Sequence, residues 1–288
     1  MKKLIERLLI FFIGIPAVSA LVLVLHFNNN LALNLAATFF SAVGAVEFSS
    51  MLEKKHIRIS KIESFILGAI APLAVTLHVS FYLPEWIVLT LIMAGAGWAL
   101  MSGIFSRGPE IDKVINKVIG GFSLLIYPGF FMYWLIKMSS WGNPAVILLF
   151  LFITFGSDSI AWLAGNLFGA NNRGIIAVSP NKSIAGFIGG SAGSVLVAVC
   201  AALIYPAVYM SETAVSASNL FLYAVIIGFC TGIAAMLGDL AESAIKRSCD
   251  FKDSGNFVLG RGGVLDSIDS ITVAAPVFYF LYYHLVVF

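Results

Sequence analysis

The chain has 288 residues, of which 60% are hydrophobic and only 11% are charged, and its formal net charge is +2. A water-soluble globule of this composition would have an apolar surface and would aggregate, so soluble, disordered, collagen-like and disulfide-scaffold proteins are excluded. The composition therefore predicts an all-α polytopic membrane protein, and the small net charge gives no sign of a nucleic-acid partner.

Nine apolar stretches follow one another along the chain, each close to the ~20 residues that a spanning helix needs. They are residues 8–26, 31–52, 63–83, 86–105, 117–136, 144–165, 183–209, 219–238 and 270–288. The first looks like a signal peptide, but its apolar run is longer than is typical of one, so we expect an uncleaved span. We divide the chain into N-terminal membrane helices, residues 1–143 with about five spans, and a catalytic membrane region, residues 144–288 with about four.

The basic residues indicate the orientation of these spans. With nine spans, sixteen of the 17 Lys and Arg residues fall on one side of the membrane, and only Lys137 falls on the other. Because Lys and Arg concentrate in cytoplasmic loops, we expect a cytoplasmic N-terminus and a C-terminus outside. The longer polar connections, 166–182 and 239–269, are then cytoplasmic, and we expect the chemistry to lie there.

Residues 238–270 form a segment that holds ten of the 32 charged residues. If span eight continues into it as a helix, one face carries four polar residues: Asp239, Glu242, Ser243 and Lys246. Asp266 and Asp269 lie one turn apart at the entry to span nine. Carboxylates suit Mg²⁺, which acts with substrate phosphates, and neighbouring Lys or Arg can clamp those phosphates. The segment fits metal-assisted phosphoryl or nucleotidyl transfer, and a structural ion-pair cluster in a solvated loop is the alternative.

A second polar region precedes span seven. Asp158 lies inside span six, where an acid is a functional candidate and a buried structural hydrogen bond is the alternative. The run Ser179-Pro180-Asn181-Lys182-Ser183 is typical of a helix start. The free N–H groups of that start, beside Lys182, are a candidate phosphate-binding site. Glu47, near the end of span two, is expected to reach the interface rather than to join a site.

The polar segment carries a spaced pattern that resembles the signature of the phosphatidate cytidylyltransferases, also called CDP-diacylglycerol synthases. The pattern reads Gly238-Asp239-Leu240-x-Glu242, Ser243-x-x-Lys246-Arg247, Lys252-Asp253 and Gly260-x-Gly262-Gly263-x-x-Asp266-x-x-Asp269. The stretch from Asp158 to Ser183 resembles a second part of that family's pattern. The resemblance implies a multi-pass inner (plasma) membrane enzyme with a cytoplasmic active site. Such an enzyme makes CDP-diacylglycerol and pyrophosphate from CTP and phosphatidate with Mg²⁺; a second cation and a homodimer stay open.

The resemblance also implies roles for single residues. Asp239 and Asp266 look like the principal metal ligands, with Glu242 and Asp269 beside them. The phosphate-contacting cations of the catalytic set are Lys246, Arg247 and Lys252. The residues expected to bind CTP or its phosphates are Asp158, Ser179, Asn181, Lys182 and Arg261.

Three positions depart from the family's usual pattern. This chain has Ala185 where the family has Glu, Arg261 where it has His before the glycine pair, and Ser267 where it has Arg. These departures leave the carboxylates in place. They keep open a polyprenol or phytol kinase relative, a CTP-transferase acting on another lipid, and a catalytically impaired homologue. A transporter that uses Asp158 and Glu47 is a further alternative.

Overall fold

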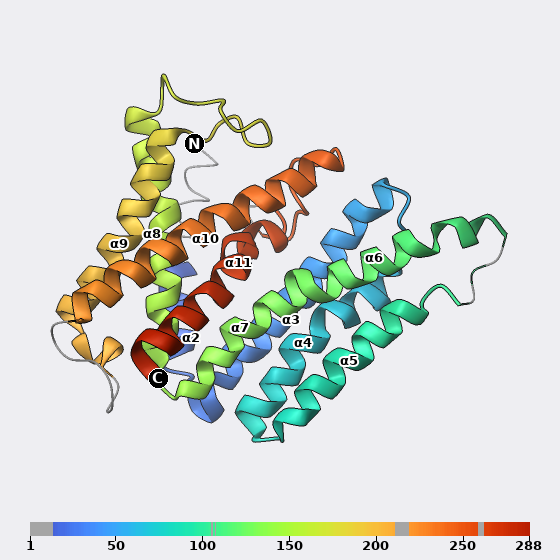
Figure 1. Ribbon diagram of the computed structural model, residues 1–288, viewed down its shortest axis with the longest axis horizontal. Helices are drawn as coiled ribbons and strands as arrows, with labels where there is room; N and C mark the ends of the chain where they lie inside the picture. Colours follow the sequence, from blue (N-terminus) through green and yellow to red (C-terminus); the bar gives the residue numbers. More distant parts are fainter. Residues whose placement is uncertain (1–13, 105, 107, 211–218, 259–261) are drawn as a thin grey trace. The chain divides into compact units, whose positions relative to one another are not determined.

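The structure is a computed structural model, and it describes residues 14–104, 106, 108–210, 219–258 and 262–288. Over these residues the chain forms helices joined by loops, with isolated bridges in place of a sheet (Figure 1). The all-α prediction is confirmed, since each of the nine apolar stretches contains a helix in its described part.

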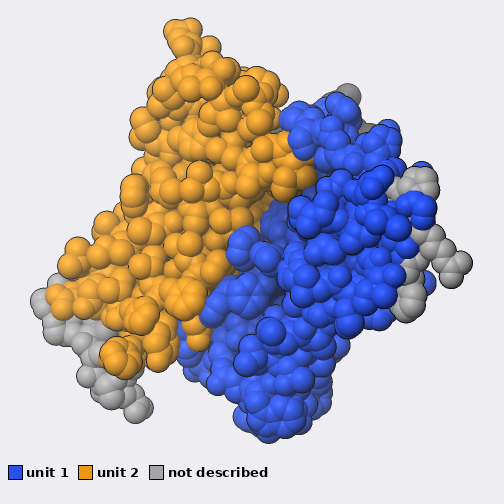
Figure 2. Space-filling model, turned by 45° about the vertical axis from the view of Figure 1, so that its right-hand side comes forward, with its two compact units in different colours: residues 1–142, 246–268 blue, residues 143–245, 269–288 orange. Residues whose placement is uncertain are grey.

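The chain divides into two compact units, each built from two stretches of sequence (Figure 2). The first unit joins Met1–Gly142 to Lys246–Ile268, and the second joins Asn143–Ile245 to Asp269–Phe288. Residues Lys246–Ile268 of the polar segment group with the N-terminal helices.

The first unit is a helical bundle built around α3 and α4. Its helices are α2 (Ile15–Leu23), α3 (Phe27–Lys54), α4 (Lys61–Phe81), α5 (Glu85–Met101), η2 (Gly108–Lys113), α6 (Val114–Leu124), η3 (Leu125–Phe130), α7 (Phe131–Lys137) and η4 (Met138–Trp141). Small residues let α3 and α4 approach closely. A Cβ on Gly68 would lie 2.4 Å from the Cβ of Ala45, and the Ser41 hydroxyl donates to the Gly68 carbonyl at 2.7 Å.

The second unit pairs α8 with α9 and adds two long helices. Its elements are α8 (Pro144–Phe168), α9 (Ile184–Ile204), η5 (Pro206–Tyr209), α10 (Leu220–Ser248), α11 (Leu265–Tyr282) and η6 (Tyr283–Val287). The last turn of α10 and the first turn of α11 are assigned to the first unit. Glycines on α9 meet α8 at short range, since a Cβ on Gly189 would lie 2.3 Å from the Cβ of Ala164. The glycines of this helix therefore serve close helix packing.

Seven helices in the described part of the chain are long and apolar enough to cross a membrane. They are Phe27–Lys54, Lys61–Phe81, Ile111–Trp141, Pro144–Phe168, Ile184–Ile204, Leu220–Ser248 and Leu265–Val287. The apolar helix α5 has 17 residues, which is short for a span. The protein is thus a multi-pass membrane protein, while the count of nine and the orientation stay predictions.

Candidate active site

The helix α10 continues through the start of the polar segment, as its periodicity predicted. It ends at Ser248, ten residues beyond Gly238. The Ser243 hydroxyl donates to Oδ1 of Asp239 at 3.4 Å, one turn earlier on the same helix. Glu242 is fully buried. The helical face that carries Asp239, Ser243 and Lys246 is therefore confirmed.

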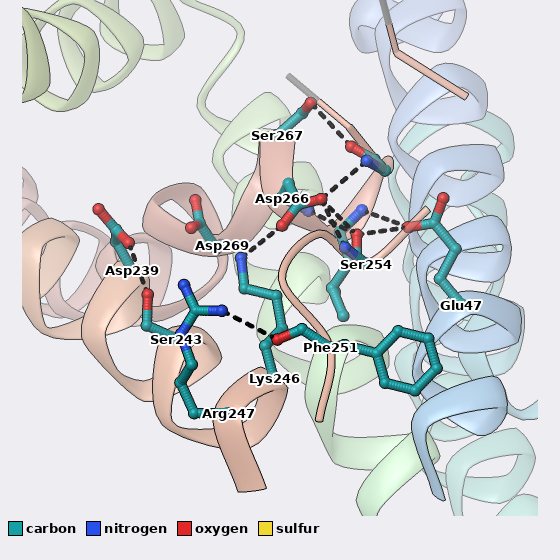
Figure 3. Close-up of polar contacts among 12 residues, drawn as sticks. Glu47, Asp239, Ser243, Lys246, Arg247, Phe251, Ser254, Asp266, Ser267 and Asp269 are labelled. Carbon is teal, nitrogen blue, oxygen red and sulfur yellow. Dashed lines mark hydrogen bonds and ion pairs between the residues drawn. The ribbon is translucent and has the colours of Figure 1, made fainter. Parts of the chain in front are cut away.

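Asp266 is held by three hydrogen bonds and an ion pair. Its Oδ2 accepts hydrogen bonds from the Ser254 N–H at 2.7 Å, the Ser254 hydroxyl at 2.8 Å and the Gly263 N–H at 2.8 Å. Its Oδ1 forms an ion pair with Lys246, which lies on α10 (Figure 3). Only 7% of the Asp266 side chain and 10% of the Lys246 side chain are exposed. Burying these charges is tolerated because each is paired and hydrogen-bonded.

Two glycines make room for this carboxylate. Gly262 has φ +106°, a conformation that favours glycine, and a Cβ there would lie 2.7 Å from Oδ2 of Asp266. A Cβ on Gly263 would lie 2.0 Å from the Ser254 hydroxyl. The glycine pair therefore brings backbone close to the protein's own carboxylate.

Glu47 takes part in the same network, and the expectation that it only reaches the membrane interface is wrong. Its Oε1 accepts from the Val264 N–H at 3.0 Å, and its Oε2 accepts from the Leu265 N–H at 2.8 Å and the Ser254 hydroxyl at 3.0 Å. Leu265 begins α11, whose first N–H groups have no acceptor within the helix. A carboxylate at this position satisfies them and complements the helix dipole. Sequence reasoning missed this role because the partners lie more than 200 residues apart.

In the second unit, Asp239 pairs with the loop before α9. Its Oδ2 lies 2.7 Å from Nζ of Lys182, and the two side chains are 34% and 26% exposed. The loop is folded back by a hydrogen bond from Gly174 N–H to the Pro180 carbonyl, and the Ser183 hydroxyl caps α9 by accepting from Gly186 N–H at 3.0 Å. The predicted helix start is confirmed. The loop before it brings Lys182 into an ion pair with Asp239.

Asp158 and Asp269 meet through one serine. The Ser270 hydroxyl donates to Oδ2 of Asp158 at 3.4 Å and lies 3.3 Å from Oδ1 of Asp269. The backbones of α10 and α11 also touch here, because a Cβ on Gly238 would lie 2.5 Å from the Asp269 carbonyl oxygen. The second unit thus brings an acid of α8 and an acid of α11 to the same serine.

The sequence profile of the Cytidylyltransferase family matches residues 5–285. The chain belongs to the cytidylyltransferase family. The resemblance carried by the polar segment is confirmed by this match over nearly the whole chain.

Several curated relatives of this chain carry the name phosphatidate cytidylyltransferase. One from Haemophilus influenzae is 36% identical over 138 residues, which are 48% of this chain and 46% of that protein. One from Bacillus subtilis is 32% identical over 158 residues, 54% of this chain and 55% of that protein. One from Thermotoga maritima is 35% identical over 183 residues, 62% and 65% respectively. The chain thus spans about half to two thirds of the length of these relatives.

The remaining predicted residues are less enclosed. The Arg247 guanidinium donates to the Phe251 carbonyl at 3.1 Å, and Lys252 is exposed. Asn181 is exposed and Ser179 is half-buried in the loop before α9. Arg261 lies outside the described residues.

The carboxylates fit a magnesium ion that is shared with a substrate. Among the residues that the structure describes, no three His, Cys, Asp or Glu side chains are grouped to hold a metal by themselves. Mg²⁺ that works on nucleotides needs only one or two carboxylates, because the substrate phosphates and water complete its shell. Asp266 and Asp239 each present an oxygen to a positively charged lysine, and Oδ2 of Asp266 is oriented by other donors. An oriented carboxylate with one oxygen turned to a cation has the chemistry that a metal ligand requires.

Proposed function

We propose that this protein is a phosphatidate cytidylyltransferase that converts CTP and phosphatidate to CDP-diacylglycerol and pyrophosphate. The family and the names of its relatives support this function over transport. The observation that carries the proposal is the pairing of both candidate metal ligands with candidate phosphate cations. Asp266 forms an ion pair with Lys246, and Asp239 forms an ion pair with Lys182.

The reaction joins a phosphate oxygen of the lipid to the α-phosphorus of CTP. The bond from that phosphorus to the bridging oxygen breaks, and pyrophosphate leaves with the bond electrons. No side chain has to remove a proton first, because a phosphate monoester is already ionised near pH 7. Asp239 and Asp266, with Glu242 and Asp269, are the proposed Mg²⁺ ligands, and a bound Mg²⁺ would offset charge on the triphosphate and on the leaving pyrophosphate.

The lysines bind and orient the anionic groups in this scheme. Lys246 and Lys182 each neutralise an aspartate, and leaving a carboxylate as buried as Asp266 alone is costly. If a bound cation supplied positive charge at the carboxylates, the lysines would be released to bind and orient the substrate phosphates. This exchange keeps every charge compensated while the substrates enter.

The proposed site opens to the cytoplasm, where CTP is available. The concentration of Lys and Arg on one predicted side of the membrane supports this orientation. The apolar helices would hold the acyl chains in the bilayer, so that the lipid phosphate meets CTP at the membrane surface.

The test is turnover by the purified protein in detergent with labelled CTP, phosphatidate and Mg²⁺. We expect labelled CDP-diacylglycerol and pyrophosphate, with the rate of Asp266→Asn reduced by about 100-fold because an oriented metal ligand is lost. Asp112→Asn, at an exposed aspartate of η2, is the matched control and should keep the wild-type rate. The proposal fails if the wild-type protein forms no CDP-diacylglycerol with Mg²⁺. Activity that persists in excess EDTA contradicts the metal role.

The lipid is identified in the same assay. A panel of phosphatidate, polyprenyl phosphate and polyprenol, each with CTP, separates the proposed reaction from those of a lipid kinase or of a transferase with another lipid.

A further inference from the structure

One face of α3 contacts the polar segment within the first unit. A Cβ on Gly44 would lie 3.4 Å from Cδ1 of Leu265, so α3 and the start of α11 approach closely there. Glu47 follows one turn later and binds the segment. Nζ of Lys54 lies 5.9 Å from the ring centroid of Phe251, at the distance of a cation–π contact. These three residues lie on the same side of the helix, because their spacing follows its period.

Glu47 is the centre of this contact. Its two oxygens accept the N–H groups of Val264 and Leu265 and the hydroxyl of Ser254. The close approach depends on glycine, because a Cβ on Gly255 would lie 2.4 Å from Oε1 and one on Gly263 would lie 2.4 Å from Oε2. The loop is therefore shaped to receive this carboxylate.

Ser254 connects Glu47 to Asp266. Its hydroxyl lies 3.0 Å from Oε2 of Glu47 and 2.8 Å from Oδ2 of Asp266, and its own N–H also donates to Asp266 (Figure 3). The residue is 5% exposed, so water does not readily replace these contacts. A hydroxyl has a single hydrogen to donate, so the two carboxylates share the Ser254 hydroxyl, and a change at one of them alters the hydrogen bond to the other.

We propose that Glu47 is a positioning residue for Asp266. It holds the Ser254 loop and the first turn of α11, and these in turn fix the direction of the Asp266 carboxylate toward its cation. The inference rests on the proposed function where it concerns catalysis, since Asp266 is a proposed metal ligand. Groups that orient a ligating carboxylate affect metal affinity although they do not touch the metal.

The first test measures the loop directly and needs no activity. Glu47→Gln keeps the size of the side chain but replaces one acceptor oxygen with an N–H₂ group that cannot accept from the Leu265 N–H. We expect hydrogen exchange in peptides covering residues 254–268 to become about tenfold faster or more, as when a hydrogen bond to a charged group is lost. Glu53→Gln, at an exposed glutamate on the same helix, is the matched control and should exchange at the wild-type rate.

The second test measures the Mg²⁺ concentration that gives half the maximal rate of CTP turnover. For Glu47→Gln we expect this concentration to rise by about tenfold and kcat to fall by about tenfold to 100-fold. A change that only unfolds part of the protein lowers the rate without moving the Mg²⁺ dependence. Glu47→Asp, which keeps the charge, should recover part of both losses, and Ser254→Ala should shift the Mg²⁺ dependence in the same direction.

The outcomes separate this inference from the proposed function. Faster exchange together with a raised Mg²⁺ requirement supports the positioning role. Exchange in Glu47→Gln equal to that in Glu53→Gln overturns it, and so does faster exchange with unchanged kcat and Mg²⁺ dependence. A wild-type protein without CTP turnover overturns the proposed function, while the exchange comparison still decides whether Glu47 holds the loop.

Discussion

The two aspartates that the family resemblance marks as metal ligands are held in different ways. Asp266 is 7% exposed, and loop groups donate three hydrogen bonds to its Oδ2. Asp239 is 34% exposed and is held by Lys182 and by a 3.4 Å contact from Ser243 on its own helix. The fold thus fixes the direction of one carboxylate, whereas the other depends on a side-chain partner that can leave.

The largest expected effect on stability comes from removing the fixed carboxylate. Asp266→Ala removes the carboxylate that pairs with the buried Lys246 and that accepts from the N–H groups of Ser254 and Gly263. Breaking a buried pair from one side costs about 3–5 kcal/mol. We expect a loss of this size in thermal or denaturant unfolding in detergent, with Asp112→Ala close to wild type. The difference between the two aspartates disappears if Asp239→Ala is destabilised as much as Asp266→Ala.

The next effect concerns the close approach of α10 and α11 beside Asp239. In Gly238→Ala the new Cβ would lie 2.5 Å from the Asp269 carbonyl oxygen, so the backbones must move apart. Overpacking of this kind costs about 1–3 kcal/mol. The same unfolding measurement checks it, with Gly97→Ala as control because nothing lies within 4 Å of a Cβ at that glycine. Equal stability of the two variants would mean that this contact is not tight.

Local patterns predicted those parts of the site that are set by the helix period. The polar continuation of α10 and the capping role of Ser183 both follow from the spacing of a few neighbouring residues. The helical face also predicted that Lys246 lies on the side of Asp239. Its ion pair with Asp266, 20 residues later in the chain, depends instead on how the loop returns.

The contacts of Glu47 could not be predicted from one sequence. Its partners Ser254 and Leu265 are separated from it by 207 and 218 positions, and no local period relates residues so far apart. The available signals were an acid near a helix end and a glycine-rich turn before another helix. Each of these has a simpler explanation when it is considered alone. Only the fold of the first unit places the acid at the N-terminus of α11.

The smallest expected effect on stability is that of removing Lys182, the partner of Asp239. Lys182→Ala removes the partner of Asp239, but both side chains are partly exposed, and pairs of this kind contribute about 0–1 kcal/mol. We therefore expect unfolding close to wild type, while the KM for CTP rises by about tenfold because a charged contact to the triphosphate is lost. Lys61→Ala, at an exposed lysine that begins α4, should change neither quantity. A large loss of stability with an unchanged KM would assign Lys182 a structural role, and Asp239 would then be held as firmly as Asp266.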